Sequence, residues 1–331
     1  NVTDQEQDNV TDSEYEESTE KTYKRDRKSG AELPVYEPIE NHKEPHKGYA
    51  TLPHKMQQST ISPLALFHLF FIDYYLQTIV NNTNNYEKLK QANSLKKGCV
   101  WTLLTLKKLK IWIAIVIYMG IHKIHGIQIK RFLHISNPYE PSLYWYSKIE
   151  PLALQLRDMF KKSYVSSSQI SVDEMMICFS GCSMYTVKMK NKPVPEGYKI
   201  FSLCDAGYTY TFMFSSRIED NTDLESIPGI NKARCTVWYL VNQLPREKNF
   251  HIYMDNYFSS IPLFKYLRKN NISACGTVRT NSSKFLKELK PNNVHLLDWN
   301  TLSGVVTNDV LAILWVDNGP VTMLTTIHKI I

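Results

Sequence analysis

The chain has 331 residues, of which 43% are hydrophobic and 12% aromatic, and this composition excludes a protein that is disordered throughout. The formal net charge is +7, but residues 1–20 carry eight acidic and no basic side chains, so the other 311 residues carry 39 basic against 24 acidic side chains, or +15. Such a basic body favours a polyanionic partner such as nucleic acid, and an ordinary lysine-rich surface is the alternative.

Residues 1–58 lack hydrophobic periodicity and combine charge with four prolines, which predicts a flexible charged arm. Its KRDRK run at 24–28 is a candidate for nuclear import or phosphate contact, and a solvated charge run is the competing interpretation.

The segment 59–168 is expected to be mainly helical. Apolar residues recur at helical spacing from Ser62, with Pro63 suited to a first turn, and this predicts one helix through SPLALFHLFFIDYYLQTIV. A second helix is predicted from Leu103 to Ile121, and LQLRDMFKKSY indicates a third. The run IWIAIVIYMGI at 111–121 is too short to span a bilayer and predicts a buried helix, so no membrane partner is expected.

Strand-like patterns begin after Gln169. Strands are predicted at 170–179, 198–205, 208–216, 250–256, 274–280 and within 304–330, with helices at 232–244 and 260–270. Gly207 after Asp205 indicates a hairpin turn. The order of elements is that of an α/β layout with a mixed sheet.

The six cysteines are scattered, with no CxxC pair and no histidines at zinc spacing. Neither a structural zinc site nor a disulfide framework is indicated, and reduced thiols suit a cytosolic or nuclear protein.

Two acids lie where predicted strands begin and end. Asp173 is in SVDEMMICFSG and Asp255 closes HIYMD, so neighbouring strands would bring the two carboxylates together at one end. Such a pair suits a site for two divalent ions about 3.5–4 Å apart, in which Mg²⁺ or Mn²⁺ promotes phosphodiester cleavage. Hydrogen bonding of the two acids to neighbouring loops is the structural alternative.

Several separated blocks resemble the piggyBac family of transposases and its domesticated derivatives. These blocks are SVDEMMICFSG, KNKPVPEGYKIFSLCDAGYTYTF and YMDNYFSSIPLFKYLRKNNISACGTVRTN, together with the upstream SPLALFHLFFIDYYLQTIV and RFLHISN. The resemblance covers roughly residues 60–331, and an unrelated metal-dependent nuclease of the same fold would need five separated matches to be accidental.

The resemblance implies an α/β protein with a ribonuclease-H-like catalytic core at 169–285. A helical dimerisation and DNA-binding region would precede it at 59–168, and a β-rich insertion would follow at 286–331. The resemblance makes Asp173 and Asp255 the first two catalytic acids and metal ligands. Family members use a divalent metal, cut double-stranded DNA at inverted repeats bounded by TTAA, and join the end to a TTAA target in the nucleus. A homodimer is therefore also expected, and a small-molecule substrate is not.

The chain departs from the family pattern in several places. The third catalytic Asp of the family lies in a Gly-Gly-Val-Asp type block, and the sequence stops at Ile331 before any such block. The cysteine-rich zinc module of the family is also missing, a segment before RFLHISN is lacking, and Cys182 replaces a usual basic residue. Asp317 matches the insertion rather than the catalytic helix. The chain as given is therefore expected to be inactive or severely impaired. A degenerate or domesticated relic that binds DNA or protein is the alternative to a transposase.

Six basic residues near the blocks that resemble the family are candidates for contacts with the DNA backbone: Lys188, Lys190, Lys192, Lys199, Arg279 and Lys284. Contacts of this kind give affinity without sequence readout and weaken as salt rises.

Overall fold

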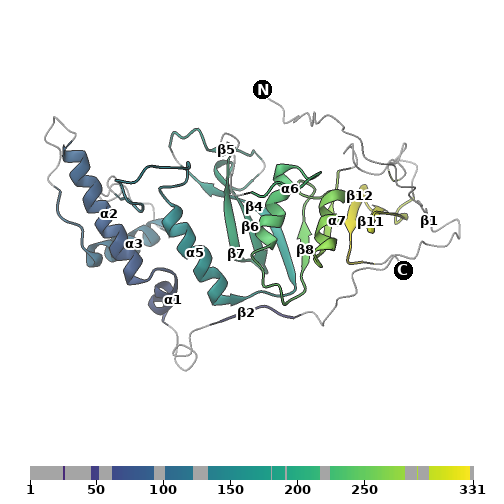
Figure 1. The fold of residues 1–331 in the computed structure, drawn as a ribbon, viewed down its shortest axis with the longest axis horizontal. Helices are drawn as coiled ribbons and strands as arrows, with labels where there is room; N and C mark the ends of the chain where they lie inside the picture. Colours follow the sequence, from purple (N-terminus) through teal and green to yellow (C-terminus); the bar gives the residue numbers. More distant parts are fainter. Residues whose placement is uncertain are drawn as a thin grey trace.

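The computed structural model describes residues 25–26, 46–51, 62–92, 101–121, 133–179, 181–190, 192–216, 224–279, 289 and 298–328. Three helices, α1 (Pro63–Phe70), α2 (Asp73–Ala92) and α3 (Leu106–Ile121), gather at one end of the molecule, and a sheet occupies the middle and the other end (Figure 1). The helix α5 (Glu150–Ser163) lies between the helical end and the sheet.

The predicted helix from Ser62 is two helices, which corrects the prediction of a single one. The Ser62 hydroxyl caps α1 by accepting the Ala65 N–H at 3.1 Å, but Phe71 leaves helical geometry and closes the turn onto the Phe67 carbonyl. A new helix then begins at Asp73, whose carboxylate pairs with Lys110 of α3 at 2.6 Å. The apolar periodicity continues through the break, so the pattern of hydrophobic residues could not reveal it.

The prediction that 111–121 forms a buried helix is wrong in one respect. The segment is helical, and Leu109 and Trp112 are buried in a small core shared with α2. Ile111, Ile117 and Tyr118 are nevertheless more than half exposed, at 53%, 56% and 53%. An apolar run buries only the sides that a neighbouring element covers, and α2 covers one side of α3.

No single helix in the described part of the chain is long and apolar enough to cross a membrane. The helices α1 and α2 reach that length and composition only as a pair, and the pair bends by 64° at its break.

Ten of the described strands form one mixed sheet. Its order is β1-β10-β11-β12-β9-β8-β4-β6-β5, and β7 pairs with β6. The strands are β1 (Arg25–Asp26), β4 (Gln169–Cys178), β5 (Val187–Lys188), β6 (Glu196–Asp205), β7 (Tyr208–Ser215), β8 (His251–Met254), β9 (Ser273–Thr277), β10 (Leu302–Thr307), β11 (Val310–Val316) and β12 (Pro320–Thr325). A separate two-stranded ladder joins β2 (Tyr49–Ala50) to β3 (Tyr164–Val165).

The strand β4 separates the antiparallel part of the sheet from its parallel part. On one side it pairs antiparallel with β6, which turns back into β7 through Ala206 and Gly207 at positive φ of 47° and 86°, as the predicted hairpin requires. On the other side β4 pairs parallel with β8, and β8 pairs parallel with β9. Parallel neighbours need crossover helices, and these are α6 (Lys232–Val241) and α7 (Ile261–Lys269).

The two faces of the sheet are covered by different helices. Side chains of α6 and α7 enter the main core on one face, including Val237, Leu240 and Phe264, which are completely buried. On the other face α5 contacts β7, where Ala153 packs with Phe212 and Phe214. The alternating pattern of β4 follows from this arrangement, because Ile170 and Val172 enter the main core and the residues between them do not.

The strands β10, β11 and β12 extend the same sheet. The strand β12 pairs antiparallel with β9, with Met323 opposite Thr277. The segment predicted to be a β-rich insertion therefore continues the sheet that carries the two acids. Two short pieces of the predicted arm, β1 and residues 46–51, also pair with the folded body, and the rest of the arm lies outside the described residues.

Candidate metal centre

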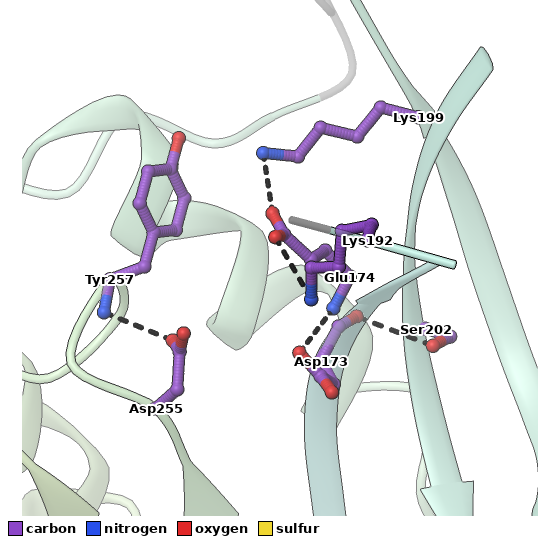
Figure 2. Close-up of polar contacts among 7 residues, drawn as sticks. All are labelled: Asp173, Glu174, Lys192, Lys199, Ser202, Asp255 and Tyr257. Atoms are coloured by element: carbon purple, nitrogen blue, oxygen red, sulfur yellow. Dashed lines mark hydrogen bonds and ion pairs between the residues drawn. The ribbon is translucent and has the colours of Figure 1, made fainter. Parts of the chain in front are cut away.

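Asp173 and Asp255 lie at matching positions of two adjacent parallel strands. The register of β4 and β8 runs from Gln169 opposite His251 to Val172 opposite Met254. Asp173 is the next residue of β4, and Asp255 is the first residue after β8. Paired residues of parallel strands are about 4.8 Å apart and project to the same face of the sheet. The structure therefore brings the two predicted acids together where β8 ends (Figure 2).

Each aspartate is oriented by hydrogen bonds to its own surroundings. Asp173 Oδ1 accepts the Glu174 N–H at 2.7 Å, and the Ser202 hydroxyl of β6 donates to the Asp173 carbonyl at 3.3 Å (Figure 2). Asp255 Oδ1 accepts the Tyr257 N–H at 3.0 Å. The Ser259 hydroxyl donates to the Asp255 carbonyl at 3.0 Å and folds the chain into a tight turn. Both carboxylates are thus held by local backbone geometry.

The electrostatics at Asp255 favour a bound cation. Partial burial raises the pKa of the Asp255 carboxyl, and the nearby charges of Asp173 and Glu174 raise it further, although hydrogen bonds from Tyr257 and Phe258 act in the opposite direction. Mutual repulsion of this kind is relieved when a divalent ion lies between carboxylates. Hard carboxylate oxygens are also the protein ligands that Mg²⁺ prefers, so the pair fits such an ion.

Glu174 is a third carboxylate near Asp173 and Asp255, but two lysines form ion pairs with it. Lys199 Nζ lies 2.7 Å from Glu174 Oε2, and Lys192 Nζ lies 3.3 Å from Oε1 (Figure 2). Burial alone would raise the pKa of Glu174, yet the two lysines outweigh burial and lower the pKa below its usual value. In the described residues no group of three or more His, Cys, Asp or Glu side chains is arranged to hold a metal ion.

The predicted backbone-contact residues are distributed unevenly around the pair. Lys192 and Lys199 meet at Glu174, and Arg279 donates from Nε to the Asn256 side chain at 3.0 Å, next to Asp255. Lys188 pairs loosely with Glu196 at 3.5 Å, and Lys190 is exposed. Lys284 lies outside the described residues.

The sequence assigned no role at the site to three residues that contact it in the structure: Glu174, Asn256 and Tyr257. Each directly neighbours a predicted acid in the sequence or follows it by two residues. Their partners come from segments far along the chain, so only the conserved-looking blocks around the acids could have drawn attention to them. Asp317 lies at the end of β11, where it accepts a hydrogen bond from Trp299 at 3.3 Å.

Replacing Asp255 by asparagine is expected to raise the stability of the metal-free chain near neutral pH. The raised pKa of Asp255 means that stability present below the unfolded-state pKa of about 3.9 is lost as pH rises through the folded-state pKa. Asparagine stays neutral and keeps an oxygen for the Tyr257 N–H. In EDTA, Asp255→Asn should therefore unfold at a higher temperature than the original chain at pH 7, and at the same temperature near pH 3.

The matched control for this comparison is Asp158→Asn, on an exposed carboxylate paired with Lys162 at 2.7 Å. Its effect is expected to stay within about 0.5 kcal/mol. A loss of stability in Asp255→Asn at pH 7 would contradict the raised pKa of Asp255, which burial and the charges of Asp173 and Glu174 cause.

Comparison with known proteins gives a consistent result. A family model described as transposase IS4 matches residues 62–132 and 127–330. The human PiggyBac transposable element-derived protein 2 is 27% identical over 262 residues, which cover 70% of this chain and 42% of that protein. A cryo-EM structure of a piggyBac transposase synaptic complex with hairpin DNA superposes with a TM-score of 0.71 at 19% identity. That match covers 86% of this chain and 64% of the other, so the chain spans less than two thirds of either relative.

Proposed function

Because the chain belongs to the transposase IS4 family and is of the piggyBac type, we propose that it carries the metal-binding part of a DNA-cleaving and strand-joining core. The single observation that supports this proposal is the parallel register of β4 and β8, which ends with Val172 opposite Met254, the residues directly before Asp173 and Asp255.

A ribonuclease-H-like core is the fold proposed for β4 to β9. Its support is the order β7-β6-β4-β8-β9, in which the three antiparallel strands β4, β6 and β7 come first in the chain and the two parallel strands β8 and β9 follow with helical crossovers. The neighbours β4 and β8 are the strands that position the aspartates, because Asp173 lies in β4 and Asp255 directly follows β8. The α/β class and the multi-stranded sheet agree with the fold of the solved piggyBac transposase.

In the proposed site Asp173 and Asp255 would hold Mg²⁺ or Mn²⁺. The metal would supply Lewis-acid activation of a phosphodiester and stabilise the leaving oxygen. The chain itself holds the two carboxylates at fixed positions through the Glu174 and Tyr257 amides. It also places ammonium and guanidinium groups beside them, where they would bind and orient the phosphates of double-stranded DNA.

The DNA partner, the TTAA target, the homodimer and the nuclear location are proposals that follow from the family. Lys192, Lys199 and Arg279 support a DNA backbone contact because they contact Glu174 and Asn256, the residues that follow the two aspartates in the sequence. The solved relative is a transposase bound to hairpin DNA.

The second candidate is a transposable-element-derived protein that binds DNA or a protein partner without cutting. The observation in its favour is that Glu174, the third carboxylate near the pair, is engaged by two lysines and so is poorly placed to complete a metal site. Under this proposal the binding surface is kept and the cleavage chemistry is lost.

A Mn²⁺ titration tests the proposed site. We expect calorimetry to detect binding to the purified chain and none to the Asp173→Ala, Asp255→Ala double variant. Binding should also raise the unfolding temperature of the original chain, because an ion that binds only the folded state at 100 times its Kd adds about 2.7 kcal/mol of stability.

The control for the titration is Asp317→Ala, which removes a carboxylate at the end of β11 and should bind Mn²⁺ like the original chain. Equal binding by the chain and the double variant would refute the shared site. Mn²⁺ binding that requires both aspartates supports the cleavage core, and DNA binding without Mn²⁺ binding supports the protein that does not cut.

A further inference from the structure

The Lys199 ammonium occupies a pocket of one carboxylate and two aromatic rings, which we call the Lys199 cage. Its walls are Glu174, at 2.7 Å from Nζ, and the rings of Phe201 and Tyr257, whose centroids lie 4.9 and 4.7 Å from Nζ. Figure 2 shows the Lys199 ammonium above the Glu174 carboxylate and the Tyr257 ring to the left of both, with Asp173 and Asp255 below.

The strand register builds the cage. Glu174 of β4 lies opposite Phe201 of β6, and Met176 lies opposite Lys199. Residues two apart on a strand project to the same face, so Glu174, Lys199 and Phe201 share one side of the sheet. Tyr257 reaches the same place from the turn that follows Asp255. The cage and the aspartate pair therefore rest on the same strands.

The cage holds its lysine tightly. The side chains of Lys199 and Glu174 are only 13% and 12% exposed. Aromatic rings attract a cation by about 0.5–2 kcal/mol, depending on how far it is desolvated, and the carboxylate adds direct charge pairing. A lysine side chain that is fixed in this way has already lost most of the rotamer freedom that it would otherwise lose on binding a ligand.

The charges around Glu174 do not balance. Lys192 and Lys199 bring two ammonium groups to three neighbouring carboxylates, those of Glu174, Asp173 and Asp255. A divalent ion held by the two aspartates would leave one positive charge in surplus. The surplus charge lies next to the aspartates that would hold the metal, which is where a phosphate of the bound strand would come.

We propose that Lys199 is a phosphate-contacting residue of the candidate site, and that Glu174 and Tyr257 are positioning residues that fix its ammonium. This inference rests on the proposed function, because it takes DNA as the ligand of the aspartate pair. It goes further in naming the residue that anchors the phosphate and the two residues that orient it.

The test is the salt dependence of DNA binding in EDTA, with a fluorescein-labelled double-stranded oligonucleotide and the full chain. Each phosphate contact by a lysine contributes about 0.9 to the slope of log K against log salt. Lys199→Met is expected to reduce that slope by about 0.9 and to weaken binding about 8-fold at 0.1 M salt. The matched control is Lys162→Met, whose lysine pairs with Asp158 at the same 2.7 Å but lies on α5.

The positioning role is tested at Tyr257, whose side chain is partly exposed at 38%. Tyr257→Leu removes the ring and should lower the slope as Lys199→Met does. Tyr257→Phe keeps the ring and should restore the original slope. A merely structural ring would change the unfolding temperature in Tyr257→Leu and leave the slope unchanged. The two Tyr257 variants also test the proposal if Lys199→Met does not fold.

The outcomes separate the two levels of the proposal. If the original chain does not bind the oligonucleotide even at low salt, the DNA-binding function itself is refuted. If the original chain shows a steep slope that Lys199→Met and Tyr257→Leu both retain, the Lys199 cage is structural and only this inference is overturned.

Discussion

Replacing Gly276 by alanine is expected to cost the folded chain about 3 kcal/mol and to weaken Mn²⁺ binding at Asp255. Gly276 lies in β9, directly opposite Met254 in the parallel ladder. A Cβ atom there would lie 2.6 Å from the Met254 carbonyl oxygen and closer still to Ser259 Oγ. Overpacking of a buried site typically costs 1–3 kcal/mol, and more where backbone must move, as here.

Gly276→Ala is also expected to affect the candidate metal site, because the atoms that it displaces position Asp255. The Ser259 hydroxyl donates to the Asp255 carbonyl, and Met254 is the residue before that aspartate. Moving either of them shifts the turn that aims the Asp255 carboxylate. Thermal unfolding and Mn²⁺ calorimetry on the same protein measure the two effects together.

Gly319→Ala is the matched control for this prediction. A Cβ at Gly319 meets nothing within 4 Å, so the substitution should change stability by less than about 1 kcal/mol. Unchanged stability in Gly276→Ala would show that β8 and β9 are spaced more widely than the register indicates.

Asp205→Ala is expected to lower the free energy of unfolding by about 4 kcal/mol. Asp205 ends β6 and is only 4% exposed, and its carboxylate accepts three hydrogen bonds. The Ser167 N–H donates to it at 2.5 Å, the Ser167 hydroxyl at 2.9 Å and the Tyr164 hydroxyl at 3.1 Å. Each partner left unsatisfied in a buried place costs about 1–3 kcal/mol.

Chemical denaturation of Asp205→Ala measures this cost, and Asp158→Ala on the surface of α5 is the control, expected within about 0.5 kcal/mol. A loss below 1 kcal/mol for Asp205→Ala would mean that water replaces the carboxylate.

Burial, together with the Asp205 carboxylate, raises the pKa of the Tyr164 phenol. The unfolded-state phenol therefore ionises first, and the free energy of unfolding should fall as pH rises above about 10.

The strands of the core could be predicted from sequence because their signals are local. The alternation in β4, the aromatic run of β7 and the Gly207 turn each report the geometry of a few neighbouring residues. The helix break at Phe71 and the exposed side of α3 could not be predicted. Both depend on which element packs alongside, and hydrophobic spacing is the same whether or not a partner covers that side.

The site shows the same division. The residue blocks that resemble a known family identified Asp173 and Asp255, but the one-to-one register that makes them neighbours belongs to strands separated by about 80 residues. The Lys199 cage joins β4, β6 and the turn after β8, and the Arg279–Asn256 contact joins β9 to that same turn. Pairings between distant segments leave no trace in the spacing of residues along the chain.

The continuity of the sheet also determines how the protein could be divided for study. Because β12 covers β9, a fragment ending after β9 would keep both aspartates but leave the backbone N–H and C=O groups of Cys275 to Thr277 without partners. An uncovered strand edge is a template for pairing with another molecule. Shortened versions that keep the aspartates but omit residues 302–325 are therefore prone to self-association through β9, and a soluble minimal core must include the last three strands.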